Sequence, residues 1–327
     1  MPNRSPRFSR RKLLLSTVVA GLVPSMASAQ PYPDRPITLV VPFPPGAVTD
    51  RAGRALAAEL GKRLGQQVIV DNVGGASGTL AGQKVLRARP DGYTLLVGTV
   101  NDMVMAPIAL KQAGYAPTDF TAIARIFQVP TILVANPSLP ADTIDEFVTY
   151  ARKQGAVPLG ATGLATLQTI GGVMLAEAAG FRFEIVPYKG GGPLLTDLVG
   201  GQVQVATMAL GSALSLLRQG KLKSLGLISL RRDPTAPDLP TVNEGRFVKG
   251  MEADLWGGLA GPPNLPAAVS TRLSVALREI LTDPPFREAE ARAGNVVAEY
   301  TDAAAFTAFV AKEETRLRTV AAKVQLD

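Results

Sequence analysis

Short apolar runs and amphipathic helical patterns alternate along the first part of the chain. Residues 37–43 form a continuous apolar run, which is typical of a strand buried in a parallel sheet. Apolar residues at positions 52–64 then recur on one face of a helix, and further apolar strands follow at 68–70 and 93–97. Because strand, turn and helix repeat at βαβ spacing, the pattern predicts an α/β fold with a mostly parallel sheet.

A second set of similar units begins near Gln128. Its predicted strands lie at residues 132–135, 159–161, 184–186, 203–208 and 225–228. Thr143 and Glu146 have the spacing of a capping box and predict a helix start. The chain becomes extended again near residues 251–259, and two amphipathic helices, around 269–280 and 306–320, complete it. The two sets therefore predict two lobes of one molecule.

The first 29 residues have the layout of a secretory signal peptide. Five basic residues precede an apolar stretch at 13–23, and the small residues Ala27 and Ala29 form a cleavage site. We expect export to the periplasm and cleavage after Ala29. Residues 9–14 resemble a twin-arginine motif, although Leu13 stands where that motif usually has Phe. The twin-arginine and the general export routes both stay open.

Composition removes several classes of function. The chain has no Cys and no His, which excludes thiolate nucleophiles, zinc–thiolate sites and histidine-based triads. The formal net charge is +7, but residues 1–29 carry +5 of it. The remainder has no basic cluster of the kind that nucleic-acid binding needs. We expect no nucleic-acid partner, no metal and no cofactor.

Four glycine-rich turns share one design, in which a strand ends and a helix begins. They lie at residues 43–50, 74–79, 160–166 and 187–193. In an open sheet such turns lie where ligands bind, and a helix start offers unpaired N–H groups to an anion. None of the turns matches a nucleotide-binding motif. The sequence therefore predicts a cleft that holds a small anion, carboxylate or phosphate.

Several single residues admit two interpretations. Asp50 and Asp197 could serve as an acid and a base, or could cap and orient the first turn of a helix. Lys189 could pair with a ligand carboxylate, contact the other lobe or face solvent. Trp256 is expected in the core or the cleft wall. Asn101, Met208 and Ala209 are candidates for setting specificity at the far end of the cleft.

Several motifs, taken in order, resemble the Bug family, the extracytoplasmic solute receptors of tripartite tricarboxylate transporters. They are YPDRPI (32–37), VPFPPG (41–46), PDGYTLL (90–96), VPYKG (186–190), TDLVGGQV (196–203), PTVNE (240–244) and WGGL (256–259). The resemblance covers about residues 31 to 325. The sequence departs from the family at Ala47 and Val48, which replace glycines, at the Ser/Gly-poor turn 161–166 and at Gln204. These departures leave fewer direct polar contacts to the ligand.

The resemblance implies a type II periplasmic-binding-protein fold, in which two βαβ lobes flank a cleft and the chain crosses between them twice. The crossings are expected near residues 127–131 and 250–255. Lobe 1 would then comprise residues 30–127 together with 250–327, and lobe 2 residues 128–249. The expected ligand-binding residues, including the specificity candidates above, are Phe43, Gly46, Ala47, Val48, Thr49, Asp50, Ser77, Gly78, Thr79, Asn101, Thr162, Gly163, Ala165, Thr166, Tyr188, Lys189, Met208 and Ala209.

The function that this resemblance implies is non-enzymatic. A monomeric receptor would capture a small carboxylate, which could be a di- or tricarboxylate, an aromatic acid or an amino acid. It would deliver the ligand to a transporter of one large and one small membrane subunit. Two alternatives stay open: a ligand sensor that reports to a membrane signalling protein, and an exported enzyme that uses Asp50 or Asp197.

Overall fold

A six-stranded sheet is built from the first and the last parts of the chain. In the computed structural model, which describes Met1, residues 32–293 and residues 296–321, its strand order is β11-β4-β10-β3-β1-β2. The strands are β1 (Ile37–Val41), β2 (Val68–Asn72), β3 (Thr94–Thr99), β4 (Thr121–Val129), β10 (Leu255–Gly261) and β11 (Val296–Val297). Its helices are α1 (Val48–Leu64), α2 (Thr79–Leu86), α3 (Ala106–Ala109), α8 (Ala267–Thr282), α9 (Pro284–Arg292) and α10 (Ala303–Ala321). We call this sheet and its helices lobe 1.

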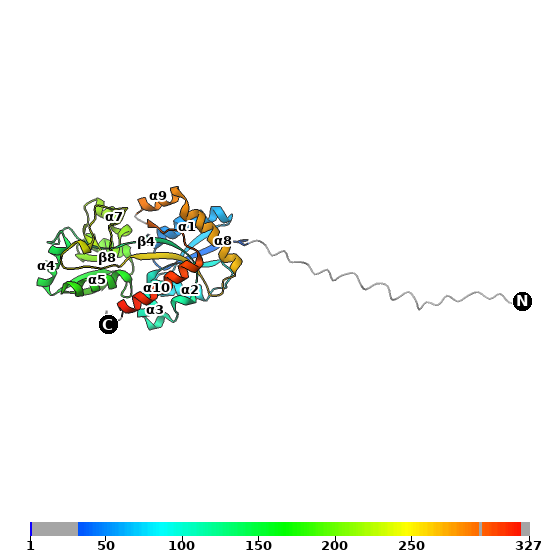
Figure 1. The fold of residues 1–327 in the computed structure, drawn as a ribbon, viewed down its shortest axis with the longest axis horizontal. Helices are drawn as coiled ribbons and strands as arrows, with labels where there is room; N and C mark the ends of the chain where they lie inside the picture. Colours follow the sequence, from blue (N-terminus) through cyan, green and yellow to red (C-terminus); the bar gives the residue numbers. More distant parts are fainter. Residues whose placement is uncertain (2–31, 294–295, 322–327) are drawn as a thin grey trace. The chain divides into compact units, whose positions relative to one another are not determined.

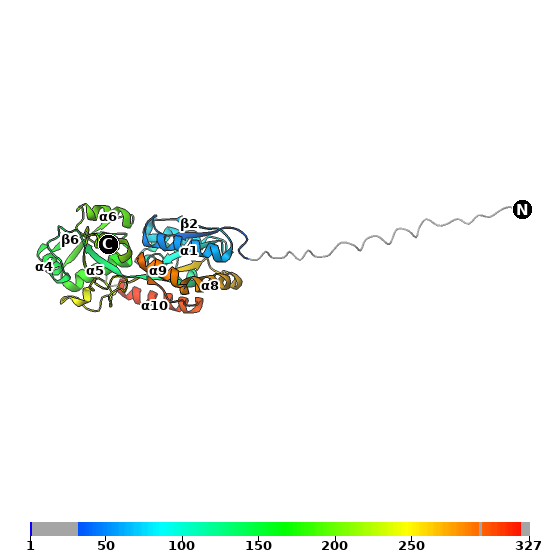
Figure 2. The same cartoon turned by 90° about the horizontal axis from the view of Figure 1, so that it is seen from above.

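A five-stranded sheet is built from the middle of the chain, in the order β7-β6-β8-β5-β9. The strands are β5 (Thr131–Ala135), β6 (Ala156–Ala161), β7 (Arg182–Pro187), β8 (Val205–Ala209) and β9 (Lys223–Leu227). Its helices are α4 (Ile144–Gln154), α5 (Leu167–Ala179), α6 (Gly191–Val199) and α7 (Leu210–Arg218). We call this group lobe 2, and Figures 1 and 2 both show its helices gathered apart from those of lobe 1.

Each sheet mixes parallel and antiparallel strands, which corrects the prediction of a mostly parallel sheet. β1 pairs in parallel with β2 and β3, and β6 does so with β7 and β8. β10, however, runs against β3 and β4, while β5 runs against β8 and β9. β5 and β10 are the first strands after the chain changes lobe. They enter their sheets from the side of the other lobe and therefore run in the opposite direction.

The chain passes from lobe 1 to lobe 2 at Pro130, which separates β4 from β5. It returns between the end of β9 at Leu227 and the start of β10 at Leu255. Hydrogen bonds tie the two passages together, because Thr131 accepts the N–H of Ile228 at its carbonyl and donates its hydroxyl to the carbonyl of Ala253. The lobe boundaries given above, at residues 127/128 and 249/250, stay a prediction.

Local sequence explains much of this architecture. The capping box at the start of α4 is confirmed: Thr143 Oγ1 accepts the N–H of Glu146, whose carboxylate accepts the N–H of Thr143. Trp256 is buried in β10, packs edge-on against Phe306 and Phe309, and donates its indole N–H to Glu313. Trp256 is therefore a core residue.

The predicted signal segment, residues 1–29, lies outside the described residues apart from Met1, so cleavage after Ala29 stays a prediction. Across the part of the chain that the structure describes, none of the helices combines the length and the apolar character that crossing a membrane requires.

Candidate ligand-binding cleft

A small cavity lies where residues of the two lobes meet, and we call it the inner cavity. Its volume is about 50 Å³. Lobe 1 contributes the turn after β1, the start of α1, Asn101 and Leu255, and lobe 2 contributes the starts of α5, α6 and α7 and the end of β8. The lining residues are Phe43, Ala47, Val48, Thr49, Asn101, Thr162, Gln168, Gly190, Gly191, Met208, Ala209, Ser212 and Leu255.

A larger cavity of about 690 Å³ adjoins the inner cavity, and we call it the outer cavity. The two cavities share Phe43 and Thr162 as lining residues. The other residues around the outer cavity are Pro44, Gly74, Gly75, Ala76, Ser77, Gly78, Leu110, Gln112, Gly163, Leu164, Tyr188 and Lys189. All four glycine-rich turns therefore contribute to one of these two adjoining cavities.

Asp50 fixes the conformation of the turn before α1, which lines the inner cavity. Its carboxylate accepts hydrogen bonds from the N–H of Gly46 at 2.9 Å, from Asn72 Nδ2 at 3.0 Å and from Arg54 Nε at 3.1 Å. Burial opposes ionisation of Asp50, but these donors outweigh it and hold the pKa of the carboxyl below its usual value. Asp50 is thus an ionised group that orders the turn. The first N–H groups of α1, at Val48 and Thr49, have no partner inside the helix.

The start of α5 is capped from the other lobe. Asn101 Oδ1 accepts the N–H of Leu167 at 2.7 Å, and Asn101 Nδ2 donates to Gln168 Oε1 at 2.9 Å. Within lobe 2, Thr166 Oγ1 accepts the N–H of Thr169. Two amides at the start of α5, those of Leu167 and Thr169, are thereby bound by protein groups and unavailable to an anion.

Asn101 is positioned by a buried carboxyl group. It opens a short π-helix, η2 (Asn101–Met105), and its N–H donates to Thr99 Oγ1. Thr99 in turn donates its hydroxyl and its N–H to Asp102 Oδ1, at 2.6 and 2.8 Å. Asp102 is fully buried, and this burial raises its pKa to about 7 although the bonds from Thr99 act in the opposite direction.

The start of α6 brings backbone of lobe 2 to the inner cavity. Gly190 has a φ of 157°, and a Cβ at this position would lie 3.2 Å from the side chain of Pro44 in lobe 1. Only glycine fits this close approach without strain. Next to it, Tyr188 donates its hydroxyl to Asp197 at 2.9 Å, so Asp197 orients a ring at the outer cavity.

Further contacts join the lobes around the cleft. Arg51 of α1 donates one guanidinium N–H to the carbonyl of Gly46 and another, at 3.0 Å, to the carbonyl of Gly211 in α7. A Cβ at Gly163 would lie 3.1 Å from Ser77 Oγ of lobe 1. Together with the Asn101 bridge, these contacts describe a closed cleft.

Comparison with known proteins identifies the family to which this chain belongs. The family described as "Tripartite tricarboxylate transporter family receptor" matches residues 52–326. The chain belongs to this receptor family. A relative from Agrobacterium vitis, named for the TAR-I ttuE-ttuC′ intergenic region, is 32% identical over 299 residues, which are 90% of this chain and 86% of the relative. Protein BugT of Bordetella pertussis is 30% identical over 270 residues, 82% of each chain, which confirms the resemblance to the Bug family.

Solved structures of similar proteins have the same two-lobe fold as this receptor. The periplasmic binding protein BugD is 34% identical with a TM-score of 0.83, covering 89% of this chain and 98% of its own. R. palustris Rpa4515 with adipate is 29% identical with a TM-score of 0.85, covering 89% and 97%. The type II-like fold expected from the sequence is therefore confirmed.

The receptor brings most of the predicted site residues to the two cavities. Eight line the inner cavity: Phe43, Ala47, Val48, Thr49, Asn101, Thr162, Met208 and Ala209. Five more line the outer cavity: Ser77, Gly78, Gly163, Tyr188 and Lys189. The other predicted residues, Gly46, Asp50, Thr79, Ala165 and Thr166, line neither cavity. The assignment of ligand contacts to any of them stays a prediction.

Sequence reasoning missed part of the inner lining. Gly190 and Gly191 lie in a turn that was identified, but the expected contacts were placed on the preceding Tyr188 and Lys189. Gln168, Ser212 and Leu255 were not identified at all. Gln168 follows a predicted turn by two residues, so the start of α5 offered a weak signal for it.

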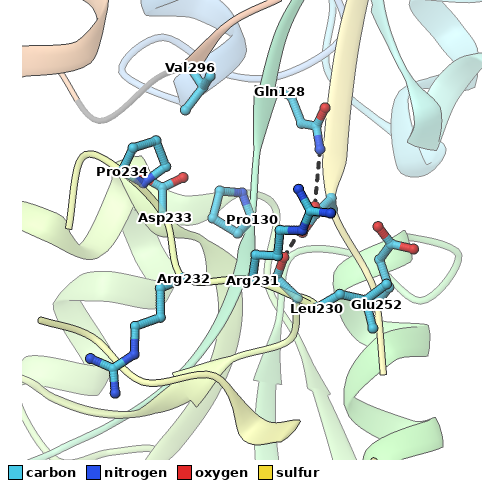
Figure 3. A pocket seen from close by; sticks show the side chains of 11 residues that line it. Gln128, Pro130, Leu230, Arg231, Arg232, Asp233, Pro234, Glu252 and Val296 are labelled. Atoms are coloured by element: carbon cyan, nitrogen blue, oxygen red, sulfur yellow. Dashed lines mark hydrogen bonds between the residues drawn. The ribbon is translucent and has the colours of Figure 1, made fainter. Parts of the chain in front are cut away.

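A third cavity, of about 430 Å³, lies at the two chain crossings, and we call it the hinge cavity (Figure 3). Its lining residues are Gln128, Pro130, Ser229, Leu230, Arg231, Arg232, Asp233, Pro234, Glu252, Asp254 and Val296. Gln128 Nε2 and Ser229 Oγ donate to Asp254 Oδ2, at 3.1 and 3.3 Å, which links the two crossings. Among the described residues, Asp254 Oδ1 is buried without a partner, and burial together with the charges of Glu252 and Asp233 raises its pKa to about 6.

Proposed function

We propose that this receptor captures a small organic anion bearing a carboxylate and delivers it to the membrane subunits of a tripartite tricarboxylate-type transporter. The observation that carries the proposal is the inner cavity, to which α1 of lobe 1 and α6 of lobe 2 both present their N-terminal turns. Unpaired helix N–H groups and the positive end of the helix dipole favour a carboxylate. The similar protein Rpa4515, whose structure was solved with adipate, supports the same ligand class.

Ligand capture would couple to closure of the cleft. A carboxylate that accepts hydrogen bonds from both helix starts has partners in both lobes only when the lobes meet. Hydrogen bonds to charged groups contribute about 1.5–3 kcal/mol each, so two or three of them favour the closed form strongly. Arg51 and Asn101 add protein contacts across the same cleft. The two crossings would serve as the hinge.

The location that fits this role is the periplasm. The basic, apolar and small-residue segments of residues 1–29 are those of an exported protein. N-terminal sequencing of protein recovered from the periplasm tests the proposed cleavage after Ala29. A mature chain that still begins at Met1 would contradict it.

Binding is tested on mature protein that has been unfolded and refolded to remove any ligand acquired during expression. A panel of mono-, di- and tricarboxylates and amino acids is screened for a rise in melting temperature. At a ligand concentration of about 100 times Kd, the expected stabilisation is about 2.7 kcal/mol. Refolded, monodisperse protein that responds to no carboxylate in the panel would overturn the proposal.

Turnover assays separate capture from catalysis. An enzyme would need Asp50 or Asp197. Asp50 uses both carboxylate oxygens to bind Gly46, Asn72 and Arg54, and Asp197 accepts the hydroxyl of Tyr188. We expect every bound carboxylate to be recovered unchanged. Co-purification with the two membrane subunits then separates transport from signalling, because a signalling input would instead bind a membrane sensor.

A further inference from the structure

Asp102 lies directly behind the linings of both cavities. It follows Asn101, which lines the inner cavity, and its own side chain is fully buried. Gly78 lines the outer cavity, and a Cβ at that position would lie 2.7 Å from Asp102 Cβ. A carboxyl group thus lies one layer behind the cleft without lining either cavity.

The side-chain hydrogen bonds of Asp102 fall on one of its two oxygens. Oδ1 accepts both the N–H and the hydroxyl of Thr99, whereas Oδ2 is buried without a partner among the described residues. An ionised carboxylate has two equivalent acceptor oxygens, but a neutral acid has one carbonyl acceptor and one hydroxyl. Leaving a neutral hydroxyl unpaired also costs much less than leaving a buried charge unpaired. The pattern therefore fits a neutral acid with its proton on Oδ2.

Nearby charges do not compensate an ionised Asp102, whose pKa is set by burial and by hydrogen bonds. The elements packed against η2 include β3, η1 (Ala76–Gly78), α2, α3 and α10. Their charged residues pair with other groups or face solvent: Lys84 pairs with Asp71, Glu313 with Arg316 and Glu314 with Arg318, and Lys312 is exposed. Tyr115 donates its hydroxyl to the Asp102 carbonyl at 2.5 Å, and burial raises its pKa, so it stays neutral at physiological pH.

Burial of this region depends on closure of the cleft. Asn101 is 1% exposed because α5 of the other lobe covers it and bonds to it through Leu167 and Gln168. These bonds cross the cleft, so opening breaks them and admits water to the start of η2, beside Asp102. Water favours the charged form of a carboxyl group. The closed form therefore favours the neutral acid, and the open form favours the carboxylate.

On the basis of the proposed function, we propose that Asp102 is a positioning residue that makes ligand binding depend on a proton. The neutral acid supports the Asn101 bridge of the closed, ligand-holding form, and its ionisation favours the open form. Because the closed form holds the proton more tightly, ligand affinity is highest in acid. It falls as the pH rises through the pKa of Asp102 in the closed form, about 7, and is constant above it.

Calorimetry on the refolded mature protein tests this inference. The probe is the tightest carboxylate of the screen whose own groups do not titrate between about pH 5.5 and 8.5. We expect its affinity to fall at least about fivefold between about pH 5.5 and 8 and then to stay constant. An affinity that is constant across the whole range would overturn the inference while leaving the proposed function intact. If no carboxylate binds at all, both fall.

Three variants assign the proton. Asp102→Asn keeps the acceptor for Thr99 but cannot ionise, so its affinity should not change with pH. Asn101→Ala should bind more weakly and should also lose the pH dependence, because water then reaches Asp102 in both forms. Asp254→Asn, which neutralises the hinge carboxyl, is the matched control and should keep the wild-type pH dependence. A pH dependence that persists in Asp102→Asn or in Asn101→Ala, or that disappears in Asp254→Asn, would overturn the inference.

Discussion

The inner cavity and the hinge cavity both lie where the two lobes meet, yet their linings are opposite in character. The hinge cavity is larger, about 430 Å³ against 50 Å³, and it is lined by several charged residues, whereas the inner cavity has none. Figure 3 shows Asp233 on one side of the hinge cavity and Glu252 on the other. The inner cavity is instead lined by helix starts and by uncharged side chains. Charged side chains therefore distinguish the cavity at the crossings, and the N-terminal turns of helices distinguish the proposed ligand site.

Filling each cavity with the same side chain should separate their roles most clearly. Ser212→Trp places a ring in the inner cavity, from a position that is only partly buried, and should weaken carboxylate binding at least 100-fold because the ligand space is occupied. Leu230→Trp at the hinge cavity, on a residue that is 54% exposed, should change the affinity by less than about threefold. Calorimetry with the best ligand of the screen measures both. Equal losses of affinity in the two variants would contradict the assignment of the ligand to the inner cavity.

Removing Asn101, which caps α5 from across the cleft, should reduce the ligand affinity less than Ser212→Trp does. Asn101→Ala removes two bonds between the lobes, and a lost helix cap costs about 0.5–2 kcal/mol. Because these bonds exist only when the cleft is closed, the affinity should fall about 2- to 30-fold, and small-angle scattering should show a more open protein.

The matched variant is Thr166→Ala, which removes a cap on the same helix from within lobe 2. It should lower the melting temperature while leaving the affinity within about threefold of wild type. If Thr166→Ala weakens binding more than Asn101→Ala does, the start of α5 contacts the ligand directly and the role given to Asn101 is wrong.

Substitution of the hinge carboxyl should have the smallest effect on ligand affinity, and should be visible mainly as a pH dependence of the free energy of unfolding. The pKa of Asp254 is raised from 3.8 to about 6, so the folded protein holds this proton more tightly than the unfolded chain does. Its stabilising contribution is complete below about pH 4 and is lost as the pH rises through 6. Relative to wild type, Asp254→Asn should therefore gain up to about 3 kcal/mol in free energy of unfolding between about pH 4 and 7.

Urea unfolding across this pH range measures the difference between the two proteins. Comparison with Asp254→Asn isolates this group from Asp102, whose pKa is raised as well. Asp50 should act in the opposite sense, because its pKa is lowered and its contribution is lost on acidification. If the difference in free energy of unfolding between wild type and Asp254→Asn does not change with pH, burial does not raise the pKa of Asp254 as described.

The strands and helices that local pattern encodes were predictable. The apolar runs and capping residues of β1, α1 and α4 specify these elements without help from the rest of the chain. Strand direction was not predictable, because the reversed pairing of β5 and β10 depends on where the chain changes lobe. β4 was missed as well: Arg125 and Gln128 interrupt its apolar pattern. α7 follows β8 with no turn between them and so gave no clear start signal. The start of α9 did carry one, because Asp283 followed by Pro284 is a typical helix beginning, but it was overlooked.

The candidate site was predictable to the level of turns. Strand–turn–helix spacing located the backbone that lines both cavities, because such turns gather at one edge of a sheet. It could not show that Asp50 faces its own turn, or that Asn101 closes the start of α5 from the other lobe. Nor could it bring Leu255 and Ser212 to one cavity, since these residues meet only through tertiary packing.

The position of β10 has a consequence for the order in which the molecule can form during synthesis. β10 lies between β3 and β4 in the lobe 1 sheet, but it begins only at residue 255. When the ribosome has released the chain as far as β9, every strand of the lobe 2 sheet is available, whereas β3 and β4 still expose unpaired edges. β3 and β4 thus wait for the last quarter of the polypeptide, and lobe 2 can complete its sheet while lobe 1 is unfinished.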